Sequence, residues 1–119
     1  MTVVLALTIM VVGALAATVR YGISMLLAQR AGWGVFVVNV VGSAIGGAVL
    51  ALAQRGAVSD DVRLILLTGL CGGLTTFSTF GVETIQFALD GRLRAAALDV
   101  GVNLAVGVGA AAGAFLLLR

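Results

Sequence analysis

The sequence has few charged side chains and lacks several residue types altogether. Only 10% of its 119 residues are charged, and lysine, histidine and proline are absent. Soluble domains average about 25% charged residues, so this composition excludes a soluble globular domain and a disordered segment. The single cysteine, Cys71, excludes an intrachain disulfide. Because histidine is missing as well, the usual zinc and iron sites are excluded.

Most of what is present is apolar, at 61% of residues, and the formal net charge of +2 is too small and too scattered for nucleic-acid binding. We therefore predict an all-α integral membrane protein, in contact with lipid and multi-pass in the cell membrane. A span needs about 20 apolar residues, so the chain has room for about four. The positions of the charges place these helices at about 2–27, 33–54, 62–88 and 94–118. The loops are too short to hold a domain, so residues 1–119 form one four-helix membrane domain.

The arginines are divided almost evenly between the two ends of such a bundle. The end with both termini carries Arg55, Arg63 and Arg119, and the other end carries Arg30, Arg92, Arg94 and, if it reaches out of its helix, Arg20. Orientation in the membrane depends on an excess of positive charge on one side, which is missing here. The balance favours insertion in both orientations and an antiparallel pair around a two-fold axis in the membrane plane.

Polar side chains inside the spans are costly in lipid, so each needs an explanation. Asn39 and Asn103 lie mid-span, where an interhelical hydrogen bond and a place on a substrate pathway are both open interpretations. Arg20 either extends its side chain to the interface or supplies a charge to a vestibule. Glu83 and Asp99 lie near the same membrane face, within reach of arginines there.

Close contact between membrane helices relies on small residues. The chain has seventeen glycines. Three pairs of them have the spacing of a small-residue contact, and these are Gly42 with Gly46, Gly69 with Gly73, and Gly109 with Gly113.

The third span holds the strongest signal. Residues 69–81 read Gly-Leu-Cys-Gly-Gly-Leu-Thr-Thr-Phe-Ser-Thr-Phe-Gly, and adjacent glycines before a run of hydroxyl residues do not favour a continuous helix. We predict a break near 72–76, which would free backbone carbonyls from Gly72 to Thr75 to bind a cation. The alternative is an intact helix whose hydroxyls bond to the preceding turn. Phe77 and Phe80 share one face beyond the break.

These segments resemble the Fluc (CrcB-type) fluoride channel family. Residues 72–80, Gly-Gly-Leu-Thr-Thr-Phe-Ser-Thr-Phe, match that family's third-helix signature almost word for word, and Asn39 to Ser43 resembles its second-helix Asn-x-x-Gly-Ser motif. Residues 13–21 resemble its first-helix motif ending in Arg-Tyr, with Ala14 and Ala16 where glycines are common. The resemblance extends over the whole chain.

The resemblance implies an antiparallel, dual-topology homodimer with two fluoride pathways. A structural Na⁺ ion would lie at the dimer interface, held by the backbone carbonyls of Gly72 and Thr75 from both subunits. The ion pathway would include Asn39, Phe77, Ser78, Thr79, Phe80 and Asn103. Arg20 and Glu83 would belong to the vestibule. In this chain Asp99 stands where the family often has Tyr, and Val35 where some members place a hydroxyl.

The predicted function is passive, fluoride-selective export that lowers the cytoplasmic fluoride concentration. No nucleophile–base arrangement or metal site for catalysis is present, so we do not expect an enzyme. A small proton-coupled multidrug exporter shares the size and span count, but it needs a carboxylate deep in a span. A non-transporting assembly subunit would explain the glycines and leave the Phe-Ser-Thr-Phe cluster unexplained.

Overall fold

The computed structural model describes all residues, 1–119, and every regular element in it is a helix. The elements are α1 (Val3–Leu26), α2 (Trp33–Gln54), α3 (Asp60–Leu64), the π-helix η1 (Ile65–Cys71), α4 (Gly72–Leu74), α5 (Ser78–Leu89) and α6 (Leu93–Leu118). Four segments are long and apolar enough to cross a membrane: Val3–Leu26, Trp33–Gln54, Asp60–Leu89 and Leu93–Leu118. The predicted all-helical chain with four spans is confirmed.

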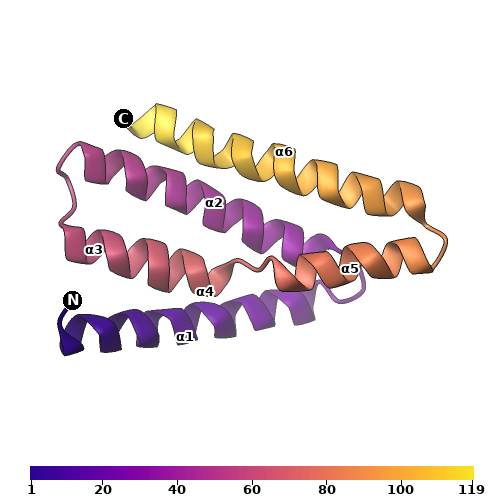
Figure 1. Ribbon diagram of the computed structural model, residues 1–119, viewed down its shortest axis with the longest axis horizontal. Helices are drawn as coiled ribbons and strands as arrows, with labels where there is room; N and C mark the ends of the chain where they lie inside the picture. The colour runs from indigo at the N-terminus through magenta and orange to yellow at the C-terminus, as the bar shows by residue number, and fades with distance from the viewer.

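Tight turns place both termini at one end of the bundle. Each connection between helices contains one glycine, Gly32, Gly56 or Gly91. Their φ values are 83°, 72° and 77°, a left-handed conformation that glycine adopts without strain. In Figure 1 both termini and the α2–α3 turn lie at the left, and the α1–α2 and α5–α6 turns lie at the right. At the left-hand end, Arg55 Nη1 donates to the Leu118 carbonyl at 2.9 Å, which ties α2 to the last turn of α6.

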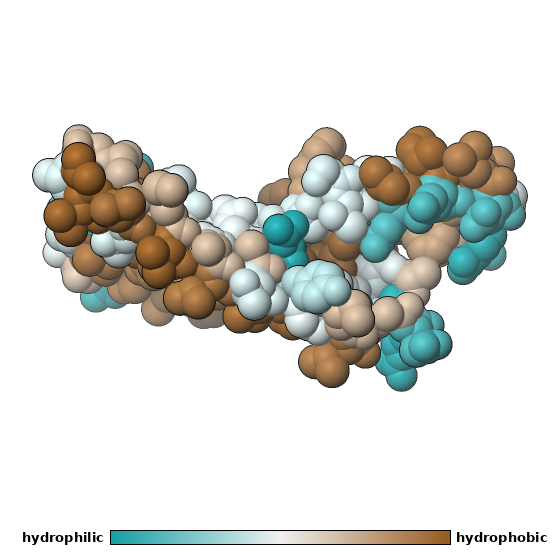
Figure 2. All heavy atoms as spheres, turned by 90° about the horizontal axis from the view of Figure 1, so that it is seen from below, coloured by the Kyte–Doolittle hydropathy of each residue, from teal (hydrophilic) through white to brown (hydrophobic).

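The helices pack as a broad, thin body of 48 × 30 × 21 Å. Helix α1 lies against η1 and α4, α2 lies against α6, and α5 reaches α6 near the right-hand end (Figure 1). Large apolar side chains such as Leu7, Met10 and Leu15 are exposed along α1, as expected of a surface that faces lipid or a partner. In Figure 2 hydrophilic side chains gather at the right-hand end, near the α1–α2 and α5–α6 turns.

Only some of the glycine pairs make the expected helix contacts within the chain. A Cβ at Gly73 would meet the Gly13 carbonyl of α1, and one at Gly69 would lie 3.1 Å from the Ile9 carbonyl oxygen. Gly109 and Gly113 have no atom within 4 Å of an added Cβ, so that predicted contact does not form inside the chain. The close contact between α2 and α6 is made at Gly47 instead, where an added Cβ would meet the backbone of Ala111.

The third span is interrupted, as predicted, but not at the adjacent glycines. Gly72 and Gly73 are still helical, and the helix ends at Thr75, whose backbone is extended with φ −89° and ψ 159°. Helix α5 starts again at Ser78. The seven-residue π-helix η1 before the break was not predicted, since no sequence pattern distinguishes it from an α-helix. Such wide turns are rare and occur often near functional sites.

Candidate ion pathway at the break in the third span

The break is held from α2 by the side chain of Asn39. Asn39 Nδ2 donates to the Thr76 carbonyl at 3.0 Å, and the Thr76 N–H donates to Asn39 Oδ1 at 2.8 Å. The two backbone groups of Thr76 require this orientation of the amide, because a flipped amide would face donor to donor and acceptor to acceptor. Asn39 therefore replaces the helical partners that Thr76 lacks. The interhelical hydrogen bond considered for Asn39 is present, and it is made to the broken segment.

Two backbone carbonyls at the break are without their helical donors. In an α-helix the Gly72 carbonyl accepts from the N–H of Thr76, and the Thr75 carbonyl accepts from the N–H of Thr79. Here the Thr76 N–H is bonded to Asn39 Oδ1, and the Thr79 N–H is bonded to Thr76 Oγ1 at 3.3 Å. Gly72 and Thr75 are the two residues expected to hold Na⁺, and neutral carbonyl oxygens in unwound helices suit that ion.

Hydroxyl groups cluster where α5 begins. Thr76 Oγ1 lies 3.3 Å from both Ser78 Oγ and Thr79 Oγ1, and it accepts the Thr79 N–H, so it caps the helix. Thr76 is buried, whereas Ser78 and Thr79 are exposed in the single chain. Of the three hydroxyl residues that could cap the restarted helix, Thr75, Thr76 and Ser78, the structure uses Thr76.

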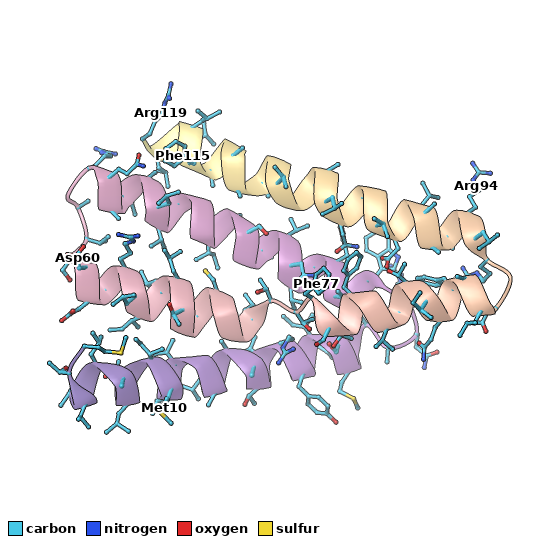
Figure 3. The ribbon with its side chains drawn as sticks, in the orientation of Figure 1. Met10, Asp60, Phe77, Arg94, Phe115 and Arg119 are labelled. Atoms are coloured by element: carbon cyan, nitrogen blue, oxygen red, sulfur yellow. The ribbon has the colours of Figure 1, made fainter.

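Phe77 and Phe80 form an edge-to-face pair at the same place. Their ring centroids lie 5.8 Å apart, with an interplanar angle of 64°. Phe80 is 9% exposed, whereas Phe77 is 82% exposed and lies at the bend between α4 and α5 (Figure 3). The positive edge of a phenyl ring attracts an anion, and its face repels one. The pair can therefore present ring edges to an anion beside the break.

A cavity of about 300 Å³, here called the break cavity, brings several predicted pathway residues together. No carboxylate lines it. Its walls are Asn39, Ser43, Thr75, Thr76, Phe77, Phe80, Asn103, Leu104, Gly107 and Val108. Ser78 and Thr79 lie outside these walls, although both hydroxyls approach the buried Thr76 hydroxyl.

A second cavity, here called the arginine cavity, lies on the other side of Thr76. It has a volume of about 300 Å³, and Arg20, Ser24, Val35, Thr76 and Thr79 are among its walls. Arg20 Nε is buried without a hydrogen-bond partner. The guanidinium therefore faces a cavity beside the break. Val35 lines this same space.

The remaining polar residues lie toward the right-hand end of the bundle. A cavity of about 350 Å³, here called the mouth cavity, is lined by Trp33, Phe36, Arg92, Asp99 and Asn103, among others. Asp99 bonds to Thr84 and Asn103, and Glu83 Oε2 is buried without a partner. Neither carboxylate forms the ion pair with an arginine that its position near this membrane face allows.

The chain is similar to known proteins over most of its length. Residues 7–115 match the model of the family described as CrcB-like protein, Camphor Resistance (CrcB). The chain belongs to this family. A Roseiflexus protein named fluoride-specific ion channel FluC is 42% identical over 115 residues, which cover 92% of this chain and 90% of the relative. Proteins of the same name from Aeromonas salmonicida and Shewanella halifaxensis are 41% and 39% identical, each alignment covering 79% of both chains.

Proposed function

We propose that this protein is a fluoride channel that releases fluoride passively across the cell membrane and so lowers its cytoplasmic concentration. The observation that carries the proposal is the break cavity, where an amide, hydroxyls and a phenyl pair meet without a carboxylate. Membership of the CrcB family and the names of the relatives support the same function. The family consists of ion channels, so the protein is not an enzyme.

Fluoride is small and strongly hydrated, so a pathway must replace its water with hydrogen-bond donors. Asn39 keeps one amide hydrogen beyond its bond to Thr76, and the hydroxyls of Ser78 and Thr79 can rotate toward an ion. The ring edges of Phe77 and Phe80 offer weaker, positively polarised contacts. Several weak contacts in series suit conduction better than one tight site, because the ion must also leave.

The carbonyls of Gly72 and Thr75 would hold Na⁺. When bound, the ion supplies a fixed positive charge that favours anions nearby. The chain contributes the extended backbone at Thr75 and the Asn39 bond that keeps the Thr76 N–H away from Gly72. Two carbonyls from one chain are too few to surround a hard cation, which takes several oxygen ligands. A second copy would double the carbonyls.

That second copy is oriented oppositely, in an antiparallel homodimer with two pathways. The even division of the arginines leaves neither orientation preferred. The exposed ring of Phe77 is a further argument, because an aromatic pair on a pathway needs a wall on its open side and one chain leaves that side uncovered. The membrane-plane two-fold axis would pass between the two breaks.

Neither alternative function is supported. A proton-coupled exporter needs a titratable carboxylate at its substrate site, and the break cavity has none. A structural subunit needs no donors at a break in the membrane, and none of the three relatives named above is described as one.

Growth of a fluoride-sensitive bacterial strain tests the proposal in cells. Expression of the wild-type chain should restore growth in fluoride, and the Phe80→Ile variant, made in equal amount, should not. Failure of the wild-type chain to protect while it is present in the membrane would contradict the proposed function.

A further inference from the structure

Asp99 on α6 binds two side chains whose positions matter for the pathway. Asp99 Oδ2 lies 2.7 Å from Thr84 Oγ1 on α5, and Asp99 Oδ1 lies 3.1 Å from Asn103 Nδ2. Thr84 Oγ1 also lies 2.9 Å from the carbonyl oxygen of Phe80, one turn earlier on α5, so its single hydrogen is shared between that carbonyl and Asp99 Oδ2. Both carboxylate oxygens are therefore engaged, and Asp99 connects α6 to the helix that carries Phe80.

These bonds determine which way the Asn103 side chain faces. Asn103 Nδ2 donates to the backbone carbonyl of Asp99 at 2.8 Å as well as to its carboxylate. An amide nitrogen has two hydrogens, so both have acceptors at residue 99. The opposite orientation would bring the amide oxygen against two other oxygens. The Asn103 Oδ1 atom is left buried, with no donor from the protein.

Asn103 is also the residue at which two cavities meet. It lines the mouth cavity together with Asp99 and Arg92, and it lines the break cavity together with Asn39 and Phe80. An ion moving between the end of the bundle and the break would pass this side chain. At that point the chain presents a hydrogen-bond acceptor, which repels a bare anion.

We infer that Asp99 is a positioning residue that turns the Asn103 amide away from the pathway, so that fluoride passes Asn103 with a water molecule and loses that water only beyond it. A water can donate one hydrogen to Asn103 Oδ1 and the other to fluoride. A buried acceptor without a protein donor is usually satisfied by such a water. Removing the Asp99 acceptor frees one Asn103 hydrogen, which can then bind fluoride directly.

This inference rests on the proposed fluoride pathway, and its test separates the two. Fluoride efflux from liposomes is measured against internal fluoride concentration for wild type, Asp99→Ala and Asp99→Asn. One added hydrogen bond to an ion should lower the half-saturating concentration of Asp99→Ala about five- to tenfold. Asp99→Asn removes the charge and keeps an acceptor of the same size, so its half-saturating concentration should stay within about twofold of wild type.

Asp99→Ala is also made in an Asn103→Ala background, and its half-saturating fluoride concentration is measured there. If Asp99 acts through Asn103, Asp99→Ala should produce no further shift there, within about twofold. The inference would be wrong if Asp99→Ala shifted the half-saturating concentration equally with and without Asn103. It would also be wrong if Asp99→Ala and Asp99→Asn gave equal shifts. Either result would mean that the charge of Asp99 acts alone. An unchanged half-saturating concentration in Asp99→Ala would overturn it too.

Asp99→Leu serves as a second variant, because it also removes the acceptor and suits a membrane helix better should the alanine variant fail to fold. Folded protein is verified by size-exclusion chromatography before each measurement. A wild-type protein that conducts no fluoride at all would instead contradict the proposed function. A merely structural role of Asp99 predicts lower protein yield and lower maximal efflux, with no change in half-saturation that depends on Asn103.

Discussion

Asn39 and Thr76 are joined by two hydrogen bonds, of 2.8 and 3.0 Å, that use both polar atoms of the Asn39 side chain and both backbone groups of Thr76. The two residues are 37 positions apart in the sequence. One α2 side chain therefore holds the break open. It also withholds the Thr76 N–H from Gly72, so the pathway and the carbonyl site depend on the same contact.

Asn39→Asp tests this contact. A carboxylate still accepts the Thr76 N–H, but it cannot donate to the Thr76 carbonyl, and it adds a negative charge to the break cavity. We expect at least a tenfold loss of fluoride efflux from liposomes, with the elution profile of the wild-type protein retained. Thr18→Val, which removes an exposed hydroxyl bonded only within α1, is the matched control and should conduct normally. Normal efflux through Asn39→Asp would show that the pathway is misplaced.

Phe80→Ile tests the aromatic pair. The branched side chain keeps the buried position apolar but has no positive ring edge to face an anion. Fluoride efflux should fall by at least tenfold, whereas stability should change by only about 1 kcal/mol. Phe115→Ile, made on α6 in a cavity that no predicted pathway residue lines, should leave efflux unchanged. Equal losses in the two variants would argue against a specific role for Phe80.

A sodium ion at the carbonyl site should stabilise the protein. Binding to the folded state alone raises the free energy of unfolding by about 2.7 kcal/mol at a hundred times the dissociation constant. Thermal unfolding in detergent should therefore occur several degrees higher in NaCl than in N-methylglucamine chloride at equal ionic strength. Equal midpoints in the two salts would contradict the sodium site.

Two neighbouring glycines supply variants for the same measurement. A Cβ at Gly42 would meet Thr75 Cγ2, so Gly42→Ala should displace Thr75 and reduce the sodium effect. A Cβ at Gly46 would make only ordinary contacts, 3.8 Å from Leu67 and 3.9 Å from Cys71. Gly46→Ala should therefore keep the full difference between the two salts.

Single cysteines test insertion in both orientations. In a Cys71→Ala background, cysteines replace the exposed Ala57 at one end of the bundle and the exposed Gln29 at the other. If the chain has dual topology, an impermeant thiol reagent should label about half of each variant from outside, and the remainder after permeabilisation. Labelling of each position from one side only would exclude the antiparallel homodimer.

Much of the fold could be predicted because its causes are local in the sequence. Uncharged runs bounded by charged residues predict four spans, and the Gly-Gly pair with its hydroxyl run signals an interruption. The exact place of the break could not be predicted, because it depends on Asn39 of a different helix binding Thr76. Similarly, the spacing of glycines does not predict which of them make helix contacts. Gly47 packs against α6, whereas an added Cβ at Gly109 has no atom within 4 Å.

The site residues could likewise be predicted where the cause is local, and their arrangement could not where it depends on another part of the fold. Asn39, Phe77, Phe80 and Asn103 were identified from polarity, spacing and family resemblance, and all four line one cavity. The orientation of Asn103 was not predictable, because it depends on where the Asp99 carboxylate lies. The run of four hydroxyl residues gives no sign that Thr76 is the buried one, because its burial depends on contacts with other helices.

The central claim is selective, passive fluoride conduction, and anion efflux from liposomes tests it most directly. Purified wild-type protein is reconstituted into vesicles loaded with equal fluoride and chloride, and both ions are followed with selective electrodes. The account predicts rapid release of fluoride while chloride stays inside, and no fluoride release in vesicles that carry Phe80→Ile. Equal release of the two anions, or no release of either by folded wild-type protein, would contradict it.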